Sequence, residues 1–357
     1  MSNPSCRFLS NGYKFQIDSA NNLNLMPCCM WRGDSLQVTG NLEDVDAYRA
    51  RLNSVDAHTD PRCVGCQYQE KNNLRTSWRQ KSFNFVPDNT ADDESTWLEL
   101  QLDTICNAGC IICGPWHSSF WQKELNNTII PIKSSQKEIH MDLILKTVNL
   151  DQIRRILFLG GETFLTDTDT RILSLIKNPE QVVLQYTTNG SIFPTQERID
   201  QWKQFKNTWI TLSIDGIGNK FDYIRYPLTW TKVQDNIMKM LDTMPESVRF
   251  HINHTVNILN LYYYNEFDQW RSQYLSQDRY GREITFHYNP AVGSLSPRRV
   301  PSKLLELLKT KYAPDSRPLQ TVAHTNFNQN TLVFLNEIDQ RRELNWKTIF
   351  PEIANCF

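Results

Sequence analysis

Three closely spaced cysteines are the first feature of this sequence that points to chemistry. Cys106, Cys110 and Cys113 lie within eight residues, in the segment CNAGCIICGP. Cubane iron–sulfur clusters are bound by cysteine thiolates, usually four of them. Three thiolates leave one iron open to an outside molecule, and an open ligand position also marks catalytic zinc sites. The spacing therefore predicts a cluster with one open position, on a loop because glycines and a proline interrupt the segment. The alternatives are a zinc ion or a chance grouping.

The distribution of cysteines and the overall composition limit the class of protein. Eight of the nine cysteines lie in the first 113 residues. The start of the chain lacks the apolar core of a signal peptide, and no apolar run approaches the ~20 residues needed to span a bilayer. We therefore expect a cytoplasmic protein without a membrane partner, in which metal ligation explains clustered cysteines better than disulfides do. A net charge of -1 argues against a globally basic nucleic-acid binder.

Polar motifs follow several of the apolar runs. Gly160-Gly161-Glu162 follows one run, TTNG (187–190) and SIDG (213–216) follow two others, and Asn257 follows a fourth. Each motif alone is also compatible with an ordinary turn or cap, since Asn-Gly and Asp-Gly are common turn dipeptides. Their repeated position, directly after an apolar run, favours a shared function.

Six runs with the composition or alternation of strands are separated by segments that read as helices. Strands that alternate with helices predict a parallel sheet with right-handed crossovers. Six such units are fewer than the eight of a closed barrel, so the predicted fold is α/β, an open partial (βα)6 barrel of the TIM type. The carboxyl ends of its strands would share one rim, where such folds place their active sites. The six runs are residues 97–106, 153–162, 181–190, 209–216, 248–257 and 283–290.

The chain divides by composition into three predicted parts. Residues 1–90 are a Cys-rich metal-binding module without βα alternation. A polar linker (81–96) overlaps the end of this module. Residues 91–295 form the partial barrel. Residues 296–357 form a helical or irregular C-terminal extension, with one helix expected within 296–312.

The order CxxxCxxC, GGE, TTNG and SIDG over residues 97–290 resembles the radical S-adenosylmethionine (SAM) enzymes, with similar context in CNAGCIICGPW and YIRYP. The resemblance implies that Cys106, Cys110 and Cys113 bind a 4Fe–4S cluster whose open iron takes the amino and carboxylate groups of SAM. Reductive cleavage of SAM then yields a 5′-deoxyadenosyl radical that abstracts a substrate hydrogen. Ile112 stands where the family often has an aromatic residue, and it can still pack against adenine. The residues that the resemblance assigns to SAM are Gly160, Gly161, Glu162, Thr188, Asn189, Ser213, Asp215 and, for the SAM carboxylate, Arg225.

The N-terminal cysteines resemble the auxiliary-cluster "twitch" module of the same family. The similar features are Pro27-Cys28-Cys29 and Cys63-Val-Gly-Cys66. The resemblance implies a second 4Fe–4S cluster, and its ligands would be Cys6, Cys63, Cys66 and either Cys28 or Cys29, with Cys28 taken here. A zinc ribbon is the alternative, because CxxC pairs also suit tetrahedral zinc. The spare cysteine is expected to be an inert thiol or a hydrogen donor to a substrate radical.

By this resemblance the expected function is a radical SAM enzyme that modifies a residue of a ribosomally made peptide or protein. A reductant such as ferredoxin or flavodoxin and a separate peptide-presenting protein are the expected partners. A second enzymatic hypothesis is a dehydrogenase or rearranging enzyme acting on a small alcohol, sugar or nucleoside. A third hypothesis, of another class, is a non-catalytic binding protein that is stabilised by an iron–sulfur group or zinc.

Overall fold

The computed structural model describes residues 6–71, 76–85, 96–126, 134–322 and 327–357. The chain forms two compact units, and each contains segments that are distant in sequence. Unit 1 comprises Met1–Ile105, Thr128–Tyr186 and Thr195–Trp209, and unit 2 comprises Cys106–Asn127, Thr187–Pro194 and Ile210–Phe357.

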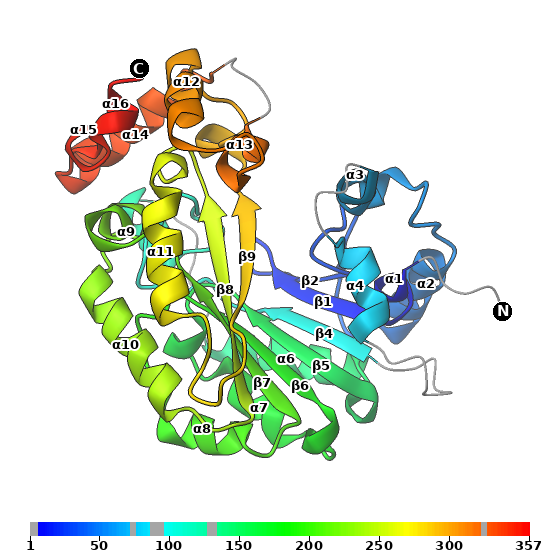
Figure 1. Cartoon of the computed structure of the whole chain (residues 1–357). Helices are drawn as coiled ribbons and strands as arrows, with labels where there is room; N and C mark the ends of the chain where they lie inside the picture. The colour runs from blue at the N-terminus through cyan, green and yellow to red at the C-terminus, as the bar shows by residue number, and fades with distance from the viewer. Residues whose placement is uncertain (1–5, 72–75, 86–95, 127–133, 323–326) are drawn as a thin grey trace. The chain divides into compact units, whose positions relative to one another are not determined.

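Unit 1 is built on a mixed sheet with the strand order β3-β2-β1-β4-β5-β6 (Figure 1). The contacts β1–β4, β4–β5 and β5–β6 are parallel, whereas β2 pairs antiparallel with β1 and β3. The strands are β1 (Gly12–Ile17), β2 (Leu23–Met26), β3 (Leu36–Gln37), β4 (Thr96–Gln101), β5 (Ile153–Leu159) and β6 (Val183–Thr188), whose last two residues belong to unit 2.

The N-terminal cysteine-rich segment shares this sheet. Its strand β1 pairs in parallel with β4, with Phe15 opposite Leu100. Of the predicted linker, residues 81–85 instead complete a helix, and residues 86–95 lie outside the described part of the chain. The boundary at residue 90 stays a prediction. The helical segments here are α1 (Arg7–Asn11), α2 (Leu42–Asn53), η1 (Pro61–Cys63), α3 (Val64–Lys71) and α4 (Trp78–Phe85).

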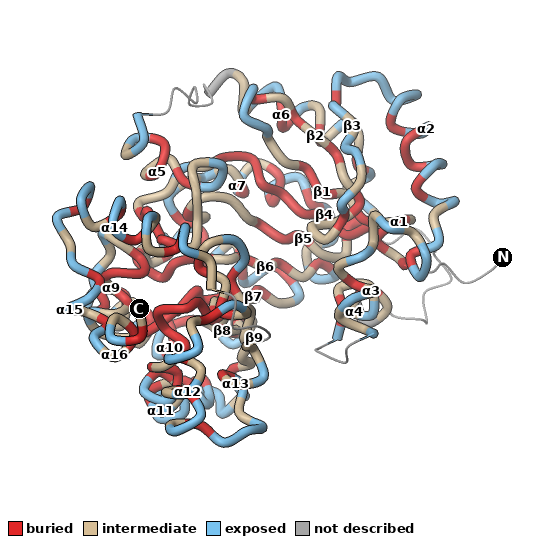
Figure 2. Tube along the Cα trace, turned by 90° about the horizontal axis from the view of Figure 1, so that it is seen from above, coloured by how far each residue is buried: buried red, intermediate tan, exposed pale blue. Residues whose placement is uncertain are grey.

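One face of the unit 1 sheet is packed with large apolar and aromatic side chains. It carries Phe15, Leu100, Phe158 and Tyr186 in register across four strands, all buried. Tyr186 contacts Trp202 of α8 (Gln196–Trp202), with ring centroids 5.1 Å apart, so a helix covers this face. The buried strands stand out in Figure 2. The remaining regular helices of unit 1 are α6 (Ser134–Thr147) and α7 (Thr168–Ser174).

Unit 2 contains most of β7 (Asn207–Ser213) and all of β8 (Val248–Val256) and β9 (Thr285–Pro290), in the order β7-β8-β9, with β8 and β9 parallel. Alternate residues of β8 are buried, which places His254 and His251 on opposite faces, as their spacing predicts. Its helices include α5 (Ser119–Glu124), α9 (Gly218–Ile224), α10 (Trp230–Thr243) and α11 (Tyr264–Tyr274).

The six predicted strands correspond to β4–β9, and helices lie between them, so the α/β class with a parallel sheet is confirmed. The C-terminal extension is more helical than its sequence suggested. The extension contains α12 (Ser302–Lys311), α13 (Arg317–Thr321), α14 (Asn330–Arg342), α15 (Trp346–Ile349) and α16 (Pro351–Ala354).

Among the described residues, no helix is long and apolar enough to span a membrane.

Candidate functional site

Cys106, Cys110 and Cys113 lie in unit 2 on the loop of residues 102–118, which follows β4 and has no helix or strand, as predicted. Backbone hydrogen bonds hold the loop on both sides of Cys110. Gly109 N donates to Tyr226 O at 2.7 Å, and Ile111 N donates to Ile224 O at 2.9 Å. None of the three cysteines is in a disulfide bond. The loop therefore carries three reduced cysteines on a fixed backbone.

Gly109 is the residue that allows the loop to pack so tightly. A Cβ atom at this position would lie 2.6 Å from the ring of Phe120 and 2.8 Å from Nη2 of Arg342. Real Cβ atoms do not approach heavy atoms so closely, so a side chain here would force Phe120, Arg342 or the loop to shift. The glycine that indicated a loop in the sequence thus has a defined steric role.

A buried ion pair lies beside Cys110. The Arg225 guanidinium is 2.6 Å from Asp215 Oδ2, and its Nη1 donates to Cys110 Sγ at 3.8 Å. The Nε atom of Arg225 is buried without a hydrogen-bond partner. Burial raises the pKa of the Cys110 thiol to about 12, and the charge of Arg225 opposes that rise. An iron–sulfur group fits these residues, because it would replace the thiol protons and bring negative charge to an arginine with an unused donor.

The TTNG turn meets the cysteine loop inside unit 2. Asn189 Nδ2 donates to Asn107 Oδ1 at 2.9 Å, and Asn107 Nδ2 donates to Ser191 Oγ at 2.8 Å. Thr188 Oγ1 accepts from the backbone N of Gly190, whose φ of +77° suits glycine. Sequence reasoning missed Asn107 and Ser191, although Asn107 directly follows Cys106. Their amide and hydroxyl connect two motifs that the sequence placed on one rim.

Ser213 and Asp215 are buried at the end of β7 in the same unit. Asp215 Oδ1 accepts from the backbone N of Thr255 at 2.6 Å, and its carbonyl oxygen accepts from Asn260 Nδ2 at 2.8 Å. Asp215 is thus held by β8 and the loop after it, and it orients Arg225.

The GGE motif lies in unit 1 and contacts the chain just before the first cysteine. Glu162 N donates to Ile105 O at 2.7 Å, and a Cβ on Gly161 would lie 2.0 Å from that oxygen. Gly160 has a φ of +143°. The Glu162 carboxylate is buried, and its Oε1 accepts from Phe164 N at 3.1 Å. Both glycines are therefore required for close approach between two segments of backbone.

Four of the N-terminal cysteines line one pocket of unit 1. Cys6 precedes α1, Cys28 follows β2, Cys63 ends η1, and Cys66 lies in the first turn of α3. Phe8, Leu9, Met30, Trp31, Ala57, Trp78 and Arg79 complete the wall. Burial raises the pKa of each of the four thiols. Four thiols that line one apolar pocket suit an iron–sulfur group, which would displace the protons that burial otherwise keeps on the sulfurs.

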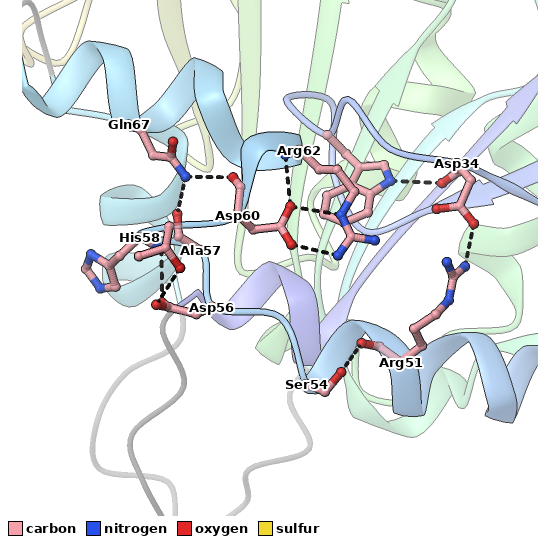
Figure 3. A network of polar contacts seen from close by, with 11 residues as sticks. Asp34, Arg51, Ser54, Asp56, Ala57, His58, Asp60, Arg62 and Gln67 are labelled. Carbon is pink, nitrogen blue, oxygen red and sulfur yellow. Dashed lines mark hydrogen bonds and ion pairs between the residues drawn. The ribbon is translucent and has the colours of Figure 1, made fainter.

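A polar network fixes the Cys63/Cys66 segment (Figure 3). Asp60 caps η1 by accepting from Arg62 N at 2.9 Å, and its carboxylate takes two further hydrogen bonds from the Arg62 side chain. Gln67 Nε2 donates to the carbonyl oxygens of Ala57 and Asp60, at 3.1 and 2.7 Å. These contacts join the turn before Cys63 to the helix that carries Cys66.

Cys29 is not among the residues that line this pocket. Burial raises the pKa of its thiol, and the charge of Glu99 raises it further. Glu99 is fully buried in β4 and lies opposite Lys14, whose Nζ is 3.4 Å from Oε1. The arrangement favours Cys28 over Cys29 as the fourth thiol. Sequence reasoning missed the pair of Lys14 and Glu99. A charged residue within each of two apolar strands could have indicated it.

Within the described ranges, no group of three or more His, Cys, Asp or Glu side chains has the arrangement of a bound metal ion's ligands.

Comparison with known proteins identifies the domain. Residues 101–269 match the model of the radical SAM superfamily. No curated protein matches the chain. Similar solved structures include histidine-tagged anSMEcpe with bound AdoMet, at 15% identity and a TM-score of 0.41 over 56% of this chain and 50% of that one. Streptococcus suis SuiB bound to precursor peptide SuiA gives 10% identity and a TM-score of 0.39 over 76% and 63%.

This chain thus spans about half the length of the first of these structures. The family match covers the cysteine loop and the GGE, TTNG and SIDG motifs. Residues 101–269 thus form a region that is similar to the radical SAM superfamily.

Proposed function

We propose that the chain uses a 4Fe–4S cluster bound by Cys106, Cys110 and Cys113 to cleave SAM and to abstract hydrogen from a residue of a ribosomally made peptide or protein. When bound, the cluster would supply the electron for this cleavage. The observation that carries the proposal is the fixed loop with three cysteines outside any disulfide bond, beside a buried arginine that donates to Cys110. Anionic clusters are stabilised by such charges and hydrogen bonds to sulfur.

The residues proposed to bind SAM each have a defined structural role. Asn189 and Thr188 shape the turn joined to the cysteine loop. Ser213 and Asp215 end β7, and Asp215 holds Arg225. Gly160, Gly161 and Glu162 form the backbone turn against Ile105. Their proposed contacts with the methionine and ribose parts of SAM rest on the family resemblance.

We propose a second 4Fe–4S cluster at the N-terminal pocket, held by Cys6, Cys28, Cys63 and Cys66. The shared pocket supports it, and so does the fixed geometry of the Cys63/Cys66 segment. The twitch-like pattern of these cysteines also motivates the peptide substrate. Ferredoxin or flavodoxin is the proposed reductant in the cytoplasm, and a separate protein is proposed to present the peptide.

Polar side chains on the adjacent strands β8 and β9 are proposed to offer hydrogen-bonding groups to a substrate. Asn289 Nδ2 donates to Asn253 Oδ1, and the rings of His251 and His287 stack with centroids 5.5 Å apart. Carboxamides pair well with peptide groups. They also pair with the hydroxyls of a sugar or nucleoside, so the small-molecule dehydrogenase remains the second candidate function.

One experiment separates these enzymes from a non-catalytic binding protein. Anaerobically reconstituted protein is reduced with dithionite and incubated with SAM, and 5′-deoxyadenosine is measured by mass spectrometry. The proposal predicts its formation by the wild-type chain and its loss in Cys110→Ala. A fully loaded wild-type cluster that forms no 5′-deoxyadenosine would instead support a binding protein. Stimulation by candidate precursor peptides, compared with sugars and nucleosides, then distinguishes the two substrate classes.

A further inference from the structure

The residues directly before and after Arg225 are both hydrogen-bonded to the cysteine loop. The carbonyl oxygens of Ile224 and Tyr226, its two neighbours, accept from the backbone N–H groups of Ile111 and Gly109, the two neighbours of Cys110. This double connection fixes the backbone of Arg225 relative to that of Cys110. The guanidinium therefore has little freedom to leave the Cys110 sulfur, which its Nη1 approaches to 3.8 Å.

Asp215 holds the other edge of the same guanidinium. The two side chains form an ion pair at 2.6 Å, with side-chain exposures of 7% and 0%. Asp215 is itself anchored by Thr255 and Asn260. Buried charges act on one another and on their neighbours more strongly than exposed ones, because water does not screen them. The Arg225 guanidinium thus contacts both a buried carboxylate and the Cys110 sulfur.

We propose that Arg225 is a positioning residue that raises the reduction potential of the cluster at Cys110, and that Asp215 limits this effect. The inference rests on the proposed function, because it concerns the cluster at these thiols. Reduction adds one negative charge, which the adjacent guanidinium stabilises and the carboxylate behind it destabilises. Charge and hydrogen bonds to sulfur are the means by which proteins set cluster potentials.

This role differs from the SAM-carboxylate contact that the family resemblance implies for Arg225. One edge of the guanidinium faces Asp215 and Nη1 faces Cys110, so Nε is the donor without a partner. A carboxylate ligand role predicts a loss of SAM affinity with an unchanged potential. If Arg225 instead acts on the cluster through the Cys110 sulfur, replacing it should change the reduction potential of the cluster even without SAM.

The test is a potentiometric titration of the reconstituted protein without SAM, in which EPR follows the reduced cluster. All variants are made in a Cys6→Ala/Cys63→Ala background, which removes the second cluster proposed at the N-terminal pocket. In that background, Arg225→Met should shift the midpoint potential to more negative values, and Asp215→Asn should shift it to more positive values. Arg225→Lys, which retains the charge, should restore most of the Arg225→Met shift. Iron content and circular dichroism are measured first for each variant.

A matched control is available in unit 1. Arg198 and Asp169 form another buried pair, at 2.8 Å with side-chain exposures of 8% and 4%, and the Arg198 side chain donates to Asp169 and Thr166 rather than to a thiol. Arg198→Met removes a comparable buried ion pair and should leave the midpoint potential unchanged. Shifts in this control as large as those of Arg225→Met would assign the effect to general destabilisation.

Two results overturn the inference. One is an unchanged potential in both Arg225→Met and Asp215→Asn with weakened SAM binding, which would make Arg225 a SAM ligand only. The other is a shift of the same sign in both variants. Failure of the proposed function is a separate observation, namely a wild-type chain that binds no cluster at Cys106, Cys110 and Cys113. If Arg225→Met does not fold, the opposite shift in Asp215→Asn and the retained potential in Arg225→Lys decide the question.

Discussion

The carboxamides of Asn107 and Asn189 meet at 2.9 Å and join the cysteine loop to the turn after β6. Asn107 also donates to Ser191 at 2.8 Å, so both ends of one side chain are used. The residue directly after Cys106 is therefore a structural link between two sequence motifs. This link gives the first prediction.

Replacing Asn189 with Ala should destabilise the loop, because it leaves the Asn107 amide without one partner. A half-buried polar group left unsatisfied costs roughly 1–3 kcal/mol. We expect a lower melting temperature and fewer irons retained per chain after gel filtration. Asn345→Ala is the control: Asn345 accepts from Lys347 N at 3.0 Å at the start of α15, so this change should lower stability by roughly 1 kcal/mol but spare the iron. Equal iron loss in both variants would argue against the link.

Gly161 should not tolerate even a methyl group. A Cβ there would lie 2.0 Å from Ile105 O, so Gly161→Ala must shift the backbone that leads to the cysteine loop. Overpacking of this kind typically costs about 1–3 kcal/mol or more. Gly114→Ala is the matched comparison, because a Cβ at Gly114 has no heavy atom within 4 Å. Urea unfolding should show a large loss of stability for the first variant and little change for the second; equal effects would contradict the packing argument.

Cys28 and Cys29 should differ in their effect on metal content. The wild-type chain with two cubanes is expected to bind about eight irons, four in each. Cys28→Ala should reduce this to about four, whereas Cys29→Ala should keep about eight, because only Cys28 lines the four-thiol pocket. Iron, sulfide and zinc are measured on the same samples. A result of about four irons plus zinc in the wild-type chain would remove the second cluster from the account.

His254 should make the fold sensitive to acid. The ring is fully buried, stacks on Phe267 at 4.2 Å and contacts Ile214 O through Nδ1 at 2.8 Å. Burial lowers the pKa of His254, so the unfolded chain binds this proton more readily than the folded one. Stability is then retained above the unfolded pKa of ~6.5 and is lost as the pH falls below it.

The measurement is urea unfolding of the apoprotein at several pH values between neutral and mildly acidic. The wild-type chain should lose more stability on acidification than His254→Gln. His251→Gln is the control, since His251 lies on the opposite, half-buried face of β8 and its replacement should preserve the wild-type pH dependence. Parallel pH profiles for the wild-type chain and His254→Gln would show that His254 is not the responsible group.

The strands that carry the site were predictable because their patterns are local. The parallel strand β5 ends in an apolar run of four residues (156–159), and β8 alternates over its whole length. The loop character of the cysteine segment followed from Gly109 and from Gly114-Pro115. These signals depend on neighbouring residues, and the structure confirms them.

The relationships that were missed depend on residues far apart in the chain. The pairing of β1 with β4 brings Lys14 opposite Glu99 across a long separation in sequence, which a local pattern cannot indicate. The contact of Arg225 with Cys110 likewise joins residues that are far apart in the sequence. Cys28 lines the four-thiol pocket and Cys29 does not, and adjacent identical residues offer no sequence pattern that would separate them.

The most direct measurement of the central claim is the EPR spectrum of the reduced Cys6→Ala/Cys63→Ala protein, recorded before and after addition of SAM. An iron with an open position, held in a cluster by Cys106, Cys110 and Cys113, predicts a reduced-cluster signal whose g values change when SAM binds. The signal should be absent from the same protein carrying Cys110→Ala. A fully loaded cluster whose spectrum is identical with and without saturating SAM would contradict the account.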